Sequence, residues 1–169
     1  MATTYIPNKD ADFATWLSNF AATALAGAVT YGFTVGQTNA FTAADVAFQA
    51  AYALAMEIFT LSKGWPSEEK YSLIDQVRRS SRGVCANLRE AWAKRRYEAH
   101  FVSKLTDADG ENSETDTWLD FAKDCGYVSK MDHARLTADC RKVGAMLGGM
   151  LNDPMPFLLK PSRRVPSGV

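Results

Sequence analysis

Hydrophobic residues recur in alternating steps of three and four through most of the chain after residue 41. This spacing places apolar side chains along one face of an α-helix. Turn residues divide the pattern into four segments, at about 42–62, 67–95, 97–125 and 129–152. No competing strand pattern is present in the sequence. Long helices joined by short connections predict an all-α, up-down-up-down four-helix bundle over residues 42–153.

Each segment has an apolar seam that we expect to face the core. The first seam contains Ala47, Ala51, Leu54, Ile58 and Leu61, widened by Phe48, Tyr52, Ala55 and Phe59. The second contains Tyr71, Ile74, Val77, Ser81, Val84, Leu88 and Ala91. The third contains Phe101, Leu105, Ala108, Asn112, Thr115, Leu119 and Ala122. The fourth contains Leu136, Cys140, Val143, Leu147 and Met150. The polar members Asn112 and Thr115 either set helix register or face the channel of an oligomer.

The ends of these helices carry recognisable capping residues. Ser67 is the expected N-cap of the second helix, and Ser129 opens a variant capping box for the fourth. Gly126 is the expected C-terminal cap of the third helix. That helix contains Asp109-Gly110, a pair common in hairpin turns. Because no alternating strands flank the pair, we interpret it as part of a continuous helix. Residues 154–169 contain four prolines and are predicted to form a flexible C-terminal tail.

The N-terminal segment, residues 1–41, differs from the rest. No charged residue occurs from Phe13 to Ala44. A stripe of apolar residues predicts an additional helix over about 10–28, followed by a loop or extended segment over 29–41. The opening YIPNKDADFATWLSNF resembles the starts of certain uncharacterised bacterial proteins, which suggests a natural or engineered fusion with a junction near 40–47. The run is polar for a membrane span and lacks the basic start of a signal peptide. We therefore expect no membrane association, and we expect the helix to pack on an apolar surface of its own or a neighbouring bundle.

The charges cancel overall but are separated along the chain. There are 19 Lys+Arg and 19 Asp+Glu, yet residues 75–98 carry a net +4 and residues 105–124 a net −6. The candidate nucleic-acid-binding residues of the second helix are Arg78, Arg79, Arg82, Arg89, Lys94, Arg95 and Arg96. The spacing of Arg78, Arg82, Arg89 and Arg96 predicts a shared helix face. Such a face neutralises phosphates. The alternative is that the basic second helix pairs with the acidic third helix, within or between subunits.

Other chemistry finds little support in the sequence. Cys85, Cys125 and Cys140 form no even framework or C-x-x-C pair, which is typical of reduced thiols in a cytoplasmic protein. A di-metal bundle site requires a glutamate three residues before each ligand histidine, and neither His100 nor His133 has one there. No glycine-rich phosphate loop is present. We therefore expect no catalytic residue, no metal and no cofactor.

Residues 48–153 resemble the four-helix-bundle proteins encoded in intervening sequences of bacterial 23S ribosomal RNA. The resemblance rests on Pro66-x-Glu-Glu-x-Tyr-x-Leu, Gln76-Val-Arg-Arg-Ser-Ser, Asn87-Leu-x-Glu-Ala, the acidic third helix and Gly126-Tyr127. Arg89 departs from the pattern, because the family usually has a small residue there, and Trp92 departs as well. The match covers about 105 of the 169 residues.

The resemblance implies four-helix bundles assembled as homopentamers, with no established enzymatic activity. It also implies similarity to accessory proteins of diversity-generating retroelements, which bind nucleic acid and a reverse transcriptase. Taken with the basic helix, the prediction is a non-enzymatic homo-oligomer that binds nucleic acid, RNA or DNA, RNA being favoured. The alternative is a structural or assembly protein whose charge-segregated helices form a ring without nucleic acid.

Overall fold

A computed structural model describes the backbone of residues 35–159 and the side chains of residues 43–159. The chain divides into two compact units, Met1–Thr42 and Ala43–Val169, and the bundle belongs to the second. The predicted helix over 10–28 lies outside the described residues, as does the end of the tail, 160–169. Both remain predictions.

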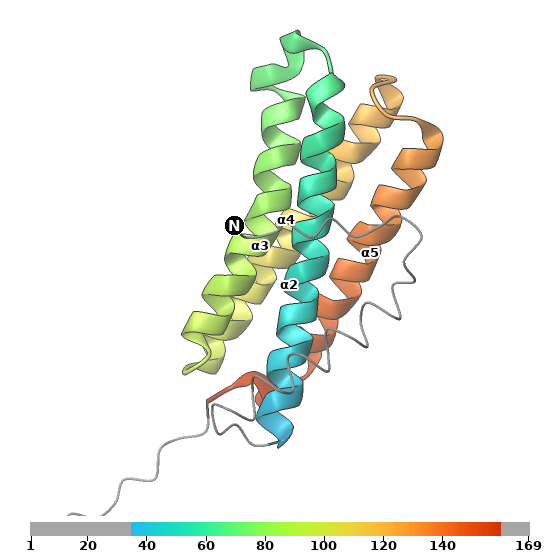
Figure 1. The fold of residues 1–169 in the computed structure, drawn as a ribbon. Coiled ribbons are helices and arrows are strands. Elements are labelled where there is room, and N and C mark those ends of the chain that lie inside the picture. Colours follow the sequence, from blue (N-terminus) through green and yellow to red (C-terminus); the bar gives the residue numbers. More distant parts are fainter. Residues whose placement is uncertain (1–34, 160–169) are drawn as a thin grey trace, which may run out of the picture. The chain divides into compact units, whose positions relative to one another are not determined.

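Four long helices make up the described chain: α2 (Val35–Leu61), α3 (Leu73–Lys94), α4 (Glu98–Asp124) and α5 (Lys130–Asn152). Successive helices run in opposite directions along a common axis (Figure 1). Short 3-10 turns complete the described structure, which contains no strand between residues 35 and 159. The predicted all-α, up-down-up-down bundle is confirmed.

The core consists of two apolar clusters stacked along the bundle. One gathers around Leu88, Phe101 and Leu147, and the other around Ile58 and Leu119. Every predicted seam residue of α4 and α5 is buried. Each buried large apolar side chain stabilises the fold by roughly 1.5–3 kcal/mol, which is why the periodic pattern determines the architecture.

Two aromatic residues that were predicted on the seams lie outside the core. Tyr71 is 85% exposed and Tyr52 is 51% exposed. Tyr71 belongs to a 3-10 helix, Ser67–Tyr71, whose three-residue period differs from that of α3. The second helix was predicted to begin at Ser67, but α3 begins at Leu73, and Ser67 is not its N-cap. The predicted start was therefore wrong by about one and a half turns.

The beginning of α2 also differs from the prediction. Gly36 and Asn39 were interpreted as part of a loop, yet the backbone is helical from Val35. Neither residue is a proline, so each lowers helix stability without preventing it. At the other helix ends the capping predictions hold. Gly126 follows α4 with a φ of +77°, and the Ser129 side chain accepts a hydrogen bond from the backbone N–H of Asp132.

Polar residues connect three helices between the two apolar clusters. The Thr115 hydroxyl of α4 lies 2.9 Å from Ser80 Oγ of α3, and Asn112 Nδ2 donates to the Cys140 carbonyl of α5 at 3.0 Å. Thr115 is 0% exposed and Asn112 is 6% exposed. Both side chains thus lie inside the bundle, which contradicts the alternative that they face the channel of an oligomer. Their specific partners suit a role in setting helix register.

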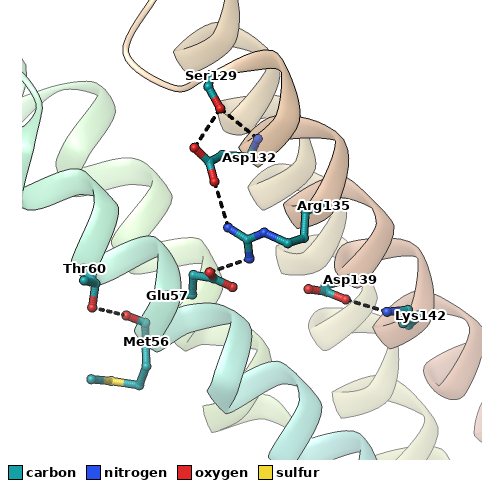
Figure 2. Close-up of polar contacts among 8 residues, drawn as sticks. All are labelled: Met56, Glu57, Thr60, Ser129, Asp132, Arg135, Asp139 and Lys142. Carbon is teal, nitrogen blue, oxygen red and sulfur yellow. Dashed lines mark hydrogen bonds and ion pairs between the residues drawn. The ribbon is translucent and has the colours of Figure 1, made fainter. Parts of the chain in front are cut away.

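Two polar links hold neighbouring helices at the end where α3 and α5 begin. The Tyr127 hydroxyl donates to Glu69 Oε1 at 3.1 Å, which ties the α4–α5 turn to the 3-10 helix before α3. On the other side, Figure 2 shows Arg135 reaching from α5 to Glu57 of α2 and to Asp132. One link thus connects the α4–α5 turn to the segment before α3, and the other connects α5 to α2.

The segment Ala43–Gly64, mostly α2, is long and apolar enough to cross a membrane by length and composition. Core helices of water-exposed bundles pass the same test. Here Ala47, Ala51 and Ile58 from this segment are fully packed into the core. These residues account for the apolar character of its inner side.

Candidate nucleic-acid interface

Helix α3 turns its apolar seam, including Val77, Val84 and Leu88, into the core. Its cationic side chains consequently emerge on the two flanks of the seam. Arg78 and Arg89 contact residues of α2, whereas Arg79 contacts α4. The candidate site is therefore divided between two flanks of α3, and each flank has different chemistry.

Arg89 is held against the start of the described part of α2. Its guanidinium carbon lies 3.7 Å from the centroid of the Phe48 ring, and Nη2 lies 3.5 Å from Asp45 Oδ1. The side chain remains 52% exposed. A cation over an aromatic face contributes about 0.5–1 kcal/mol at an exposed site. The stacking orients the guanidinium and leaves an open surface.

Arg78 and Arg82 share a second aromatic ring, Phe59. Their guanidinium carbons lie 4.9 and 5.4 Å from its centroid, and Lys63 Nζ lies 4.6 Å from it. Arg78 is fixed further by a hydrogen bond from Nε to Ser62 Oγ at 2.7 Å. Three cations thus surround one apolar ring, and the described part of the chain pairs Arg82 with no carboxylate.

Tyr52 lies between these two stacking sites along α2. Its ring is stacked on Phe48, with centroids 6.0 Å apart. We define the arginine–aromatic strip as Phe48, Tyr52, Phe59, Arg78, Arg82 and Arg89. Exposed guanidinium groups neutralise and chelate phosphates, and exposed aromatic rings stack on bases. The strip presents both kinds of group on adjacent helices.

The flank of α3 that faces α4 carries more acidic side chains. Arg79 Nη2 pairs with Glu114 Oε1 at 3.1 Å and also donates to Gln76. Among the seven predicted cations, Arg79 is the one that the described structure pairs with an α4 carboxylate. The idea that basic α3 is neutralised by acidic α4 within one chain therefore holds for this pair and fails for the other six cations.

The remaining acids of α4 have other surroundings. Asp107 pairs with Lys104 of the same helix, and Asp120 with His133 of α5 at 2.8 Å. The Glu111 side chain occupies the space that a Cβ atom at Gly83 of α3 would fill. Its Oε2 atom has no hydrogen-bond partner among the described residues. Burial raises the pKa of Glu111 above its ordinary value, and the nearby carboxylate of Glu114 adds to the shift.

The last three predicted cations lie where α3 turns into α4. Lys94 pairs with Glu90 at 3.4 Å. Arg95 stacks on Trp92, 4.0 Å from the ring, and donates to its carbonyl at 2.6 Å. Partial burial lowers the pKa of Arg95 below its ordinary value. Arg96 is exposed, and the structure of residues 35–159 gives it no partner.

The predicted common face of the arginines is correct only in part. Arg78, Arg82 and Arg89 do lie together along the α2 side. Arg96 does not continue their row, because α3 ends at Lys94 and the heptad spacing no longer applies beyond it. The sequence reasoning missed the aromatic side of the site, since Phe48 and Phe59 were interpreted as core. Their position beside a basic helix was the signal that could have identified them.

Thiol and imidazole groups are dispersed through the bundle. Cys140 is buried on the α5 seam, where burial raises its pKa to about 12, and burial raises the pKa of Cys85 to about 11. His100 packs edge-on against Tyr97, far in sequence from His133. Among the described side chains, no three His, Cys, Asp or Glu residues are arranged to hold a metal ion.

The fold and the charge distribution define a class of small helical bundle in which one flank of α3 is basic and aromatic and the other is more acidic. Comparison with known proteins identifies the family. The profile described as 23S rRNA-intervening sequence protein matches residues 45–149, and the chain belongs to this family. A similar solved structure is a protein of unknown function from the S23 ribosomal protein family of Bacteroides thetaiotaomicron. It is 25% identical with a TM-score of 0.60, and the match covers 65% of this chain and 98% of that one. No curated protein matches the chain.

Proposed function

We propose that this protein is a non-enzymatic bundle that binds nucleic acid, RNA being the preferred ligand, through the arginine–aromatic strip. The observation that supports the proposal most strongly is the arrangement of Arg82 and Arg89. Both guanidinium groups lie over phenylalanine rings of α2 and both side chains are exposed. The rings restrict the guanidinium groups and so lower the entropy lost when they bind a phosphate.

Membership of the family is consistent with RNA binding but does not specify a ligand. The name of the family places the coding sequences inside 23S ribosomal RNA genes. Exposed aromatic Tyr52 offers a stacking surface beside the cations, which suits unpaired bases in RNA loops. Acids occur on the opposite flank of α3, where Glu114 already neutralises Arg79. A polyanion is therefore expected to approach from the α2 side.

The test is the salt dependence of binding to a structured RNA, measured by fluorescence anisotropy from 50 to 200 mM salt. Each phosphate contact contributes about 0.7–0.9 to the slope of log K against log salt. The double variant Arg82→Gln/Arg89→Gln should lower the slope by about 1.4–1.8. The control Lys130→Gln/Lys142→Gln removes two exposed cations from α5 and should leave the slope unchanged. Absence of binding at 50 mM salt would refute the proposal.

Self-association is a second proposal, favoured by large exposed apolar side chains. Phe121 is 54% exposed and Met131 is 80% exposed. Such side chains are candidates for burial between copies of the chain. Light scattering at micromolar concentration and moderate salt should give the mass of two or more chains, each of 18.6 kDa. A monomeric mass would eliminate a homo-oligomeric ring.

A further inference from the structure

One end of the arginine–aromatic strip carries more positive charge than the other. At the Phe48 end, Arg89 is the cation over the ring, and the Asp45 carboxylate lies 3.5 Å from it. At the Phe59 end, three cationic groups all lie within 5.4 Å of one ring centroid. We define the cationic triad as Lys63, Arg78 and Arg82. Within the described part of the chain, no ion pair joins the triad to a carboxylate.

The triad is assembled from two elements. Lys63 comes from the 3-10 turn Ser62–Gly64 that follows α2, whereas Arg78 and Arg82 come from successive turns of α3. Ser62 is 1% exposed, and its Oγ accepts from Arg78 Nε at 2.7 Å and donates to the Phe59 carbonyl at 3.2 Å. This buried hydroxyl fixes the Arg78 guanidinium through Nε and leaves its two Nη groups outside the bond.

The nearby carboxylates do not neutralise the triad. Glu57 of α2 pairs with Arg135 of α5 (Figure 2). Asp75 lies one turn before Arg78 on α3 and forms no ion pair with a described side chain. The negative end of the α2 dipole favours cations at this position, and the Phe59 ring offsets part of their mutual repulsion. Positive charge is therefore concentrated around one ring instead of being spread along a row.

The phosphates of an RNA strand differ in charge. An internal phosphodiester carries one negative charge, whereas a terminal phosphate monoester carries about −1.5 to −2 at pH 7 and has three acceptor oxygens. Arg89 follows Arg82 by seven residues, about 10 Å along α3, so the two contact different phosphates. A group of three cations at one end of the strip suits the more highly charged phosphate.

We propose that the cationic triad binds the terminal phosphate monoester of an RNA strand, whose chain then follows the strip toward Arg89. The inference rests on the proposed function, because it names the part of the RNA that occupies one end of the strip. The terminal phosphate can belong to the 5′ or the 3′ end of the strand. The chemistry is the same in both cases, and the experiment distinguishes them.

The test is a competition measured by fluorescence anisotropy at 100 mM salt, with the full chain bound to the labelled structured RNA. The competitors are three short single-stranded RNAs of one sequence, with hydroxyl ends, a 5′-phosphate or a 3′-phosphate. A strand with the preferred terminal phosphate should compete about three- to tenfold better than the hydroxyl strand, the range for one or two added ion pairs at an exposed site. The end that gives this advantage is the end that the triad binds.

Variants place the terminal phosphate on the molecule. Lys63→Gln/Arg82→Gln removes two exposed cations of the triad and should reduce the advantage to less than about twofold. Arg89→Gln should weaken all three strands but keep the advantage, because Arg89 lies outside the triad. The matched control Lys130→Gln/Arg141→Gln removes an exposed lysine and an exposed arginine from α5 and should keep both the affinity and the advantage. Circular dichroism checks that each variant is folded.

Three results would overturn the proposal, and they separate it from the proposed function. Equal competition by the three strands, or none by any of them, overturns the triad as a terminal-phosphate site, while salt-dependent binding of the structured RNA leaves the proposed function intact. An advantage that persists in Lys63→Gln/Arg82→Gln places the terminal phosphate elsewhere and also overturns the proposal. No binding of the structured RNA at 50 mM salt overturns both proposals.

Discussion

The buried contact between Thr115 and Ser80 allows a quantitative test of how the bundle is held in register. Thr115 Oγ1 lies 2.9 Å from Ser80 Oγ and 2.8 Å from the Glu111 carbonyl, and neither hydroxyl residue is exposed. Thr115→Val keeps the branched shape but removes the hydroxyl. Ser80→Ala removes the partner on α3 and leaves Thr115 its bond to the backbone of its own helix.

The magnitude follows from the cost of unpaired buried groups. A typical intramolecular hydrogen bond contributes about 0.5–1.5 kcal/mol, and a buried group that loses its partner costs about 1–3 kcal/mol. After Thr115→Val, Ser80 retains only a long 3.4 Å contact to the Val77 carbonyl. We expect Thr115→Val to lower the free energy of unfolding by about 1–2 kcal/mol. The double variant should cost less than the two single variants together, by about 0.5–1.5 kcal/mol.

Urea unfolding followed by circular dichroism, at one protein concentration, gives the four free energies of this cycle. The control is Thr117→Val on the exposed face of α4, where the hydroxyl bonds only to the Ser113 carbonyl of its own helix. It should change the free energy of unfolding by no more than about 0.5 kcal/mol. Additive costs, within about 0.3 kcal/mol, would show that Thr115 and Ser80 do not interact across the helices.

Three further predictions concern other parts of the chain. Exposed Cys125 should be alkylated at pH 8 far faster than buried Cys140, whose pKa is raised to about 12, and equal rates by mass spectrometry would contradict the described packing. Hydrogen bonds from the Ser72 hydroxyl, the Leu73 N–H and the Tyr127 hydroxyl lower the pKa of Glu69. The ionised carboxylate therefore stabilises the fold above about pH 4.5, and this effect is lost as pH falls through the folded-state pKa. The gap in urea midpoint between wild type and Glu69→Gln should therefore be present at pH 7 and shrink below pH 4.5, and a gap that widens on acidification would be inconsistent with this sign. Deleting residues 1–40 should lower the melting temperature or change the oligomer mass, and if both stay unchanged the segment is a passive appendage.

The helical period predicted the bundle because burial along α4 and α5 follows the three-four spacing, which continues through the polar residues Asn112 and Thr115. The same spacing predicted a continuous helix through Asp109-Gly110, although this pair is a local turn signal, and α4 is helical there. Prediction failed where local chemistry overrides the period. Tyr71 continues the seam of α3 by number, but the 3-10 helix before α3 turns it to solvent.

The cations of the candidate site could be predicted from the sequence, but the residues that each cation contacts could not. A sequence indicates which cations share a helix face, but it does not indicate which neighbouring helix each flank will contact. Arg78 and Arg79 are adjacent in sequence and yet contact α2 and α4 respectively. Pro154 and Pro156 suggested a free tail, whereas stacking of Phe157 on the core residue Phe101 holds the described part, residues 154–159, against the bundle. Both outcomes depend on contacts between residues distant in sequence.

The central claim is that RNA contacts the arginine–aromatic strip of α2 and α3. The most direct measurement is the side-chain Nε–Hε spectrum of the arginines by NMR during titration with a structured RNA. The signals of Arg82 and Arg89 should shift progressively, whereas Arg135, paired with Glu57 on the α2–α5 side, should stay in place. Shifts confined to Arg135, or no shift of Arg82 and Arg89 when RNA is saturating, would contradict the claim.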